Sequence, residues 1–344
     1  MSQNVNPNVP SEVQTEPSAS PTDAHQVLLG RYRRGLTIGL ALAVLTYGGL
    51  SLRAELGRVL EHLLAFRWIF LLPVLLLSLA NYALRFVRWE FYLRELSIHI
   101  ARKDSLSIFL AGLSMTITPG KAGELLKTLL LKEVCGTPLM RSASVILVER
   151  LTDFLALVLL AGIGISTYYP DQQKWLGLLG ACLVSGVAVL NSERLSLAIL
   201  NFLRRLPGLS GLSARLEELW RAAHTLLSFR PLLLGVLLST LAWLAECIGY
   251  FVVFNGHGVQ AGLNVCVFLY AFSTIVGVVS PGGLVITDAS LGEGALLLIP
   301  GMDPSLATAA AFVIRLCTLW FAVLVGSIAL LRFQGHRSSP ESLP

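Results

Sequence analysis

The sequence contains few charged residues. Only 14% of its 344 residues are Asp, Glu, Lys or Arg, whereas soluble proteins usually carry about a quarter. Hydrophobic residues make up 54% of the chain and the mean hydropathy is +0.70. This composition excludes an ordinary soluble domain and predicts an all-α, polytopic integral membrane protein. The net charge of +5 fits basic cytoplasmic loops, and no RNA-binding signature or basic-aromatic patch indicates a nucleic-acid partner.

Motifs for catalysis and metal binding are also missing. The sequence has no HExxH, no GxSxG, no DxD-like metal site and no ATP-binding motif. Its five cysteines form no CxxC pair, and their mostly apolar neighbours predict small buried side chains rather than disulfides or metal ligands. They are Cys135, Cys182, Cys247, Cys266 and Cys317. We therefore expect no catalytic residue, no metal and no cofactor.

Long apolar runs are the main feature of the chain. A spanning helix needs about 20 mostly apolar residues, and six runs qualify. They are 35–52, 68–86, 143–165, 175–190, 231–254 and 305–331. Two shorter runs, 105–118 and 264–280, each end in Pro-Gly and are followed by short helical pieces, 121–133 and 288–299. Each pair forms either a re-entrant hairpin or two thin spans.

The basic residues favour one orientation. With the N-terminus inside and both broken segments as hairpins, 20 of the 26 Lys and Arg lie on the cytoplasmic side, Arg85 and Arg88 among them. We expect a cell inner-membrane protein with both termini in the cytoplasm. Residues 1–30 and 333–344 are predicted to be disordered tails around a membrane domain, 31–332. The cytoplasmic linker 191–230 predicts two amphipathic helices, which either lie on the membrane surface or cap the bundle.

A three-part unit occurs twice, at about 68–165 and 231–331. Each copy contains a span, a broken segment and a second span that carries an arginine, Arg150 or Arg315. The helix breaks are Pro119, Gly120, Pro281, Gly282 and Gly283. In the topology above the copies are inverted, a recurrent transporter design with discontinuous helices near the midplane. Broken backbone at membrane depth must be buried in protein or line a wet cavity.

Charged side chains at membrane depth cost roughly 2.5–3.5 kcal/mol each, so they are candidate functional residues. Arg150 and Arg315 are candidates for binding a lipid headgroup. The other headgroup candidates, around the first break, are Lys121, Ser114 and Thr118. The acids expected to balance charge, form gates or carry protons are Glu124, Glu149, Asp153, Glu246, Asp288 and Glu293.

Two groups of charges also have a structural interpretation. Glu149, Arg150 and Asp153 share one helix flank and form either a self-neutralising cluster that holds the bundle together or a polar wall that meets a headgroup. Glu124 and Lys121 occupy the first turn after a break, where a carboxylate caps the positive helix end. The same helix end would otherwise bind phosphate.

The stretch TPGKAGELLKTLLLKEVCGTPLMRSASVILVERLTDFLAL resembles the hallmark of the lysylphosphatidylglycerol synthase transmembrane-region family, whose members are also called flippase-like domains. That hallmark is a PG-[RK]-x-GE stretch, a basic run and a VER-x-x-D helix. The segment from Pro281 to Leu284 resembles the second hallmark, PGG-LG-x-x-E, and leaves Asp288 and Glu293 as alternatives for its glutamate. Arg85, Arg88 and Trp89 resemble the R-x-x-RW element. The resemblance covers roughly residues 30–332.

The resemblance implies movement of a lipid across the bilayer by alternating access. The chain ends at Pro344, so we expect a stand-alone member without the aminoacyl-transferase domain. The expected substrate is a phospholipid, a hopanoid or a polyprenyl-type lipid, and lipid-biosynthesis enzymes are candidate partners. One alternative is a membrane glycosyl- or acyltransferase with Glu124 or Asp288 as general base. The other is a scaffold for a lipid-synthesis complex.

Overall fold

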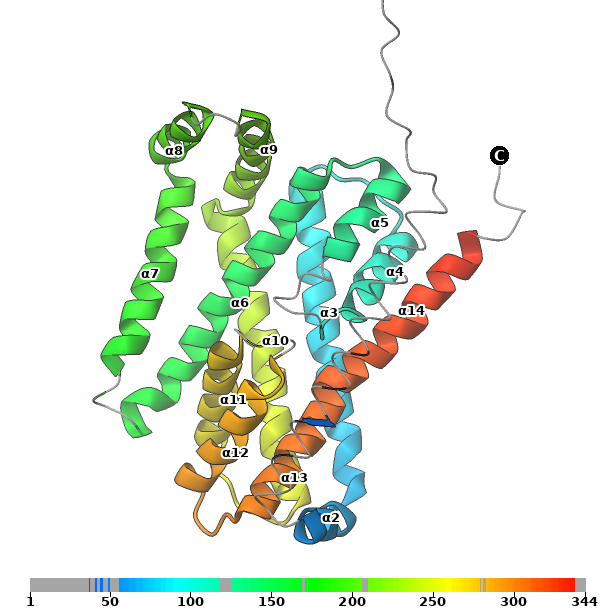
Figure 1. The fold of residues 1–344 in the computed structure, drawn as a ribbon, viewed down its shortest axis with the longest axis vertical. Helices are drawn as coiled ribbons and strands as arrows, with labels where there is room; N and C mark the ends of the chain where they lie inside the picture. Colours follow the sequence, from blue (N-terminus) through cyan, green and yellow to red (C-terminus); the bar gives the residue numbers. More distant parts are fainter. Residues whose placement is uncertain are drawn as a thin grey trace, which may run out of the picture.

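The computed structural model describes residues 56–117, 125–168, 171, 173–205, 210–278, 280 and 283–337, and five isolated positions before residue 50. All regular structure in these residues is helical (Figure 1). Four of the described helices are long and apolar enough to cross a membrane: Trp68–Glu95, Gln173–Asn191, Phe229–Gly256 and Pro304–Phe333. The predicted class, an all-α polytopic membrane protein, is confirmed.

The helices follow the predicted segments closely. The N-terminal half contains α2 (Leu56–Ala65), the 3₁₀ turn η1 (Trp68–Phe70), α3 (Leu71–Glu95), α4 (Arg102–Leu113), α5 (Leu125–Cys135) and α6 (Leu139–Tyr168). The middle contains α7 (Gln173–Asn191), α8 (Glu193–Arg205) and α9 (Ser210–Leu226). The C-terminal half contains α10 (Phe229–Gly256), α11 (Leu263–Gly277), α12 (Ile286–Leu298), α13 (Pro304–Arg315), the π-helical segment η5 (Leu316–Trp320) and α14 (Phe321–Arg337).

Some boundaries differ from the sequence-based prediction. Helix α3 continues to Glu95 rather than ending at residue 86, so Arg88, which lies beyond the predicted span, belongs to the same helix as Arg85. Helix α14 continues through Arg337 into the predicted tail 333–344. The tail 1–30 and almost all of the run 35–52 lie outside the described residues.

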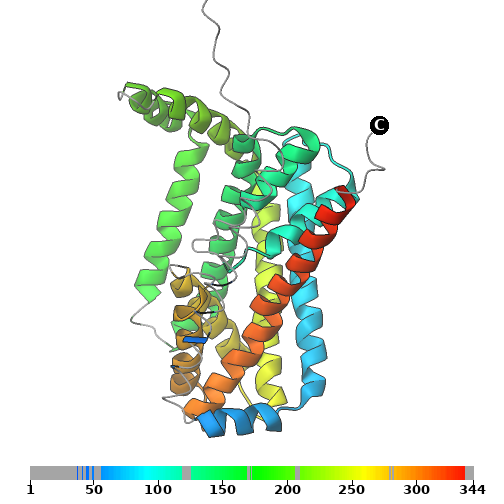
Figure 2. The ribbon, with the colours of Figure 1, turned by 45° about the vertical axis from the view of Figure 1, so that its right-hand side comes forward.

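Each of the two broken segments forms a pair of short helices that pack on each other. Helices α4 and α5 lie near one end of the bundle, and α11 and α12 lie near the other (Figures 1 and 2). These helices have 12, 11, 15 and 13 residues. At 1.5 Å per residue they measure roughly 16 to 23 Å, which is too short to cross about 30 Å of hydrocarbon. These lengths favour the re-entrant alternative over two thin spans, and the choice between them stays a prediction.

Each hairpin packs against the other half of the chain. Helix α4 packs along α14, α11 packs along α6, and α3 and α10 form the central pair. A two-fold relation between the halves would exchange the first two pairs and map the central pair onto itself. The inverted repeat stays a prediction, but this reciprocal packing is the pattern that such a repeat produces.

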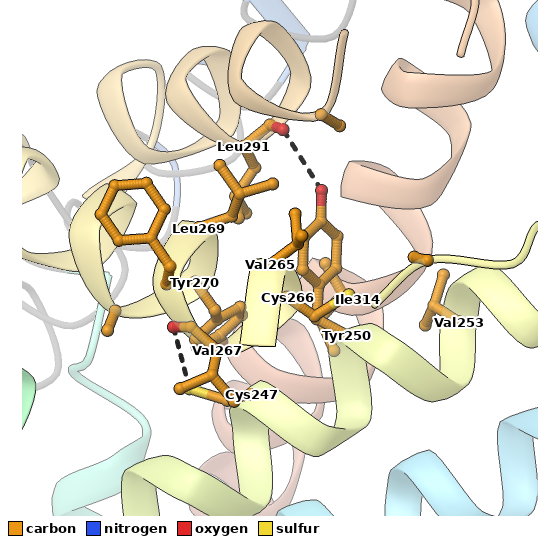
Figure 3. Packing of buried hydrophobic residues seen from close by; sticks show 14 of the residues in the cluster. Cys247, Tyr250, Val253, Val265, Cys266, Val267, Leu269, Tyr270, Leu291 and Ile314 are labelled. Carbon is orange, nitrogen blue, oxygen red and sulfur yellow. Dashed lines mark hydrogen bonds between the residues drawn. The ribbon is translucent and has the colours of Figure 1, made fainter. Parts of the chain in front are cut away.

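The largest apolar core lies where α10, α11, α12 and α13 meet (Figure 3). The buried Tyr250 ring packs there, and its hydroxyl donates to the carbonyl oxygen of Leu291 at 3.2 Å. This bond satisfies a polar group that would otherwise be costly inside the core. The cysteines are free: Cys247, Cys266 and Cys317 are buried as predicted, whereas Cys182 on α7 is exposed, contrary to expectation.

The helices of the linker 191–230 lie together at one end of the bundle (Figure 1). Helix α9 packs on α6, and its buried side chains include Trp220, Ala223 and Leu226. The Trp220 indole N–H donates to the carbonyl oxygen of Leu190 at 2.9 Å, which fixes α9 to the end of α7. These contacts favour the capping alternative for α9. Helix α8 packs on α7 and α9.

Helix α2 lies across the opposite end of the bundle, next to α13 (Figure 2). His62 Nε2 lies 3.5 Å from Asp303 Oδ2. Asp303 also caps α13 by accepting the backbone N–H groups of Ser305 and Leu306 at 2.9 and 3.1 Å. Partial burial raises the pKa of Asp303, but these hydrogen bonds and His62 outweigh it and hold the pKa below its ordinary value. The carboxylate thus stays ionised where α2 meets α13.

A glycine contact between the halves makes the reciprocal packing testable. A Cβ atom on Gly326 of α14 would overlap the backbone nitrogen of Ser114 and lie 2.7 Å from the backbone carbon of Leu113. Backbone atoms cannot rotate away, so we expect Gly326→Ala to lower the stability by about 1–3 kcal/mol. Thermal unfolding of the detergent-solubilised protein measures this change.

Gly177→Ala on α7 is the matched control, because a Cβ atom there meets nothing within 4 Å. Helix propensity alone favours alanine by about 1 kcal/mol at both positions. If both variants were equally stabilised, the close approach of α4 and α14 would be wrong.

Candidate functional site

The centre of the site is a fully buried arginine. Arg88 of α3 has no exposed surface. Its Nη1 donates to Asp153 Oδ1 at 2.7 Å and to Thr152 Oγ1 at 3.2 Å on α6, and it also donates to Ser239 Oγ on α10. Burying a charge is costly unless it is paired and hydrogen-bonded. Arg88 meets that condition through Nη1, which joins three helices. Its Nε and Nη2 make no hydrogen bond in the described residues, and Nη2 lies 3.8 Å from Glu149 Oε1.

One carboxylate binds three arginines. Asp153 lies 2.7 Å from Arg88, 2.9 Å from Arg85 and 3.0 Å from Arg150. Arg88 and Arg85 reach it from α3, while Arg150 reaches it from one helical turn earlier on α6. The Arg85 guanidinium also lies over the Trp243 ring of α10, 5.6 Å from its centroid.

A second ion pair extends this group toward the first hairpin. Lys127 Nζ of α5 lies 2.7 Å from Glu149 Oε2, and both side chains are buried. The ammonium group also lies 4.4 Å from the ring centroid of Trp89. Its alkyl chain passes over Gly112 of α4, where a Cβ atom would lie 2.6 Å from Lys127 Cγ. Only glycine leaves room for this path through the hairpin.

Together these residues form what we term the arginine cluster. Its members are Arg85, Arg88, Lys127, Glu149, Arg150 and Asp153. Four cations face two carboxylates, so the cluster carries two positive charges in excess. Arg88 and Lys127 are held at its buried side, and Arg85 and Arg150 line a cavity. A low-dielectric site with excess positive charge favours binding of an anion.

The C-terminal half contributes one arginine to the same cavity. Arg315, the last residue of α13, lies with Nε 3.0 Å from Asp288 Oδ1, and Asp288 is fully buried. The π-helical segment η5 follows directly. The Tyr82 hydroxyl donates to the carbonyl oxygen of Thr318 within this segment at 3.0 Å, which satisfies a backbone acceptor where the regular helix is interrupted. Such π-helical turns are frequent at functional sites.

The cavity between the halves has a volume of about 250 Å³. Its described charged lining residues are Arg85, Arg150, Asp153, Glu246 and Arg315, and its hydroxyl-bearing lining residues are Tyr82, Thr116, Tyr270, Thr274, Ser280, Thr287 and Thr318. Apolar side chains such as Phe154, Leu157 and Leu319 complete the wall. The structure thus brings Arg150 and Arg315 to one cavity, although they are far apart in sequence.

Comparison with known proteins identifies the family to which the chain belongs. A profile of the lysylphosphatidylglycerol synthase transmembrane region matches residues 35–326. The chain belongs to this family. The match spans both halves of the bundle and therefore the whole described cavity.

Two relatives are both named UPF0104 membrane protein and come from Methanothermobacter thermautotrophicus. One is 25% identical over 299 residues, which cover 77% of this chain and 86% of the relative. The other is 25% identical over 322 residues, which cover 86% of this chain and 91% of the relative. The family name and these relatives indicate a membrane protein in a lipid-related context.

Within this family fold, the remaining predicted acid on α10 also reaches the cavity. Glu246 Oε2 accepts a hydrogen bond from the Tyr270 hydroxyl at 2.8 Å. The same hydroxyl lies 3.4 Å from Thr318 Oγ1 of η5. Glu246 is therefore linked through Tyr270 to the helix that carries Arg315.

The tip of the second hairpin carries backbone strain. Gly283 lines the cavity with φ +71°. Val285 has φ 71° and ψ −66°, and the N–H of Ile286 bonds to the carbonyl oxygen of Leu284 at 2.9 Å. This geometry is a γ-turn that is rare and strained for a β-branched residue. Strain of about 1–3 kcal/mol persists where the surroundings hold the backbone, often at functional sites.

Several predicted site residues cannot be placed. Thr118, Pro119, Gly120, Lys121, Glu124, Pro281 and Gly282 lie outside the described residues. Ser114 is not among the described residues that line the cavity, and its hydroxyl donates to the carbonyl oxygen of Ala111 at 2.7 Å where α4 ends. Thr116 takes its place in the lining. Glu293 lies on a different, apolar cavity beside α7.

Glu149 and Asp153 hold helices together, as the structural interpretation of their motif expected, while Arg150 of the same motif faces the cavity. The sequence-based site omitted Arg85, Arg88 and Lys127. The charge bias places Arg85 and Arg88 on the cytoplasmic side, although both also resemble the R-x-x-RW element of the family. Arg85 and Arg88 are three residues apart at the end of a long apolar run, and this spacing on one helix face was the sequence feature that could have identified them as site residues.

Neutralising Asp153 tests the cluster. We expect Asp153→Asn to destabilise the protein by about 3–5 kcal/mol, because buried Arg88 loses its nearer charge partner and keeps only Glu149 at 3.8 Å. The measurement is the yield and thermal unfolding temperature of the solubilised protein. Glu293→Gln, which neutralises an exposed acid, is the control and should behave like the wild type.

A double variant separates charge from packing. Arg88→Met with Asp153→Leu removes both buried charges and should regain part of the lost stability. Equal stability of Asp153→Asn and Glu293→Gln would show that the cluster does not hold the helices together.

Proposed function

We propose that this protein is a lipid transporter of flippase type that moves a lipid headgroup between bilayer leaflets by alternating access. The observation that carries the proposal is a single cavity lined by Arg85 and Arg150 from one half and Arg315 from the other. Intramembrane charged residues are functional by default. Transporters with inverted repeats bind their substrates between the two units, near the midplane.

The charges of the cavity favour a headgroup that contains phosphate. Three arginines face two carboxylates, Asp153 and Glu246, which leaves one positive charge in excess among the described lining residues. Guanidinium groups bind phosphate through paired hydrogen bonds. A volume of about 250 Å³ is small for a ligand pocket, so the chains of the lipid would remain in the bilayer. A phospholipid or a polyprenyl phosphate-linked lipid meets these conditions better than an uncharged hopanoid.

The hairpins are the proposed gates. They lie at opposite ends of the bundle (Figure 1), and each packs against a helix of the other half. Movement of one hairpin would therefore open one side while the other stays closed. The strained turn at Val285 is a place where such a change would release stored energy.

The acids divide into two proposed roles. Glu149, Asp153 and Asp288 each face a cation at 2.7 to 3.0 Å and balance its charge. Glu246 accepts its hydrogen bond from Tyr270 and would couple transport to a proton or respond to the substrate. The proposed location is the cell inner membrane with both termini in the cytoplasm, where lipid-biosynthesis enzymes would supply the substrate.

Two other functions remain alternatives to test. A glycosyl- or acyltransferase would turn over a lipid-linked donor, which mass spectrometry of the lipid products detects. A scaffold would keep its cellular role after loss of Arg150. The transport proposal expects no new lipid product, because the chain would act without a catalytic residue, metal or cofactor. It also expects that Arg150→Gln abolishes the role of the protein in cells.

Transport by reconstituted protein tests the proposal directly. Proteoliposomes containing fluorescent phosphatidylglycerol are treated with an impermeant quencher, and the accessible fraction reports crossing. Arg150→Gln and Arg315→Gln should each slow crossing by at least about tenfold, because each removes a charge-assisted contact with phosphate. Arg221→Gln on α9, whose side chain is mostly exposed, is the control and should leave the rate unchanged.

A neutral glycolipid in the same vesicles should not be moved. The proposal fails if phosphatidylglycerol, an aminophospholipid and a polyprenyl phosphate all cross no faster than in empty liposomes. It also fails if the two cavity variants transport as well as Arg221→Gln.

A further inference from the structure

A second and larger cavity lies between α7 and the hairpin of α11 and α12. Its volume is about 550 Å³, within the range of ligand sites. Its lining is almost entirely apolar, and the polar side chains present, Ser290 and Glu293, both come from α12. We term this cavity the lateral groove. Its described lining residues are Ile165, Trp175, Leu176, Leu179, Phe268, Leu269, Phe272, Ile275, Ser290, Glu293, Gly294 and Leu297.

The lateral groove opens toward the bilayer. Helix α7 is a candidate span, and only 6% of its apolar window is buried within the protein. It packs mainly on α6 and otherwise on α8 and α9 (Figures 1 and 2), and only its Leu176 and Leu179, among the described residues, join the apolar core that α11 and α12 share. On the two sides of the groove, Trp175 is 61% exposed and Leu297 is 73% exposed. In a membrane these surfaces meet hydrocarbon and not water.

Helix α11 separates the lateral groove from the cavity with the arginines. Leu269 and Phe272 line the groove, whereas Tyr270 and Thr274 of the same helix line the cavity. On α12, Thr287 lines the cavity and Gly294 lines the groove. The two spaces therefore have different chemistry and different walls.

We infer that the lateral groove binds a hydrocarbon chain of a membrane lipid. Apart from Ser290, Glu293 and the Trp175 indole, the described lining residues offer no polar side chain with which ordered water could form its hydrogen bonds. The bilayer supplies flexible hydrocarbon at high concentration along the exposed flank of α7. A chain in the groove would contact aromatic and aliphatic side chains on three sides, from α6, α7 and the hairpin. This site goes beyond the proposed function, because chain binding does not depend on transport of the headgroup.

The site makes the second hairpin sensitive to lipid. Phe268 of α11 contributes to the groove and stacks on Phe272, with ring centroids 5.5 Å apart. Ser273 and Ser290 connect α11 and α12 through a hydrogen bond of 2.9 Å beside the groove. A chain lodged there would hold α7 against the hairpin, and its departure would free the hairpin to move.

Photocrosslinking tests this site on the full-length protein. The probe is phosphatidylglycerol with a diazirine in one acyl chain, incorporated into proteoliposomes and activated by light. Peptide mapping should place adducts on Trp175, Phe272 and Leu297. Gly294→Leu should lower these adducts about tenfold. A Cβ atom there would lie 2.5 Å from Leu269 Cδ2, so the added side chain and the displaced Leu269 narrow the groove by about two methylene groups of binding. Thermal unfolding of the same sample checks that the variant is folded.

Gly186→Leu is the matched control. It adds the same side chain to an exposed position of α7 where a Cβ atom meets nothing within 4 Å. It should leave the adducts at the groove unchanged. Transport of the headgroup is measured on the same vesicles, so loss of chain binding and loss of transport are separate results.

Three results would overturn the inference. First, the adducts could be as frequent on exposed leucines of α10, such as Leu237, as in the groove. The labelling would then reflect ordinary contact with the surrounding lipid and no site. Equal labelling in the two leucine variants would show that the groove does not hold the chain. A cysteine crosslink between Trp175→Cys and the apolar run 35–52, with no lipid adduct in the groove, would identify a helix of this chain as the occupant.

Discussion

The attraction between the Asp153 carboxylate and three arginines is the constraint on which the rest of the structure depends. It places two positive charges of α3 inside the bundle and fixes α3 against α6. Through the hydrogen bond from Arg88 to Ser239 it also fixes α10. The central pair of helices, α3 and α10, is thereby joined to the helix that carries Arg150. Because a buried charge pair is costly to break, this part of the protein is expected to stay rigid while the hairpins move.

The second half also places an arginine at the cavity, but it balances that charge with one acid rather than with a cluster. Arg315 pairs with Asp288 on the hairpin itself, whereas Arg150 pairs with an acid on its own helix. The pair on the hairpin ties the position of α12 to the arginine that faces the cavity. A ligand that competes for Arg315 would therefore act on the hairpin directly. This difference between the halves gives the proposed gates unequal stability.

The sequence predicted most of the helices, the two broken segments and the presence of Arg150 and Arg315 at one cavity, because helix breaks and isolated charges stand out within apolar runs. It did not predict the arginine cluster. Arg88 lies near the end of an apolar run, where a charge looks solvated, and its acid partner is 65 residues away. The γ-turn at Val285 and the π-helical segment after Arg315 carry no sequence pattern of their own, since tertiary packing determines both.

The most direct test of the account measures access to the cavity from the two sides of the membrane. Thr116→Cys and Thr274→Cys place thiols on opposite halves of its lining, in a protein whose five native cysteines are replaced. Membrane vesicles of both orientations are treated with an impermeant maleimide, with and without phosphate-bearing lipid. The account predicts that each thiol reacts from both sides and that the lipid slows both reactions. Thiols that react from one side only, or that ignore the lipid, would contradict it.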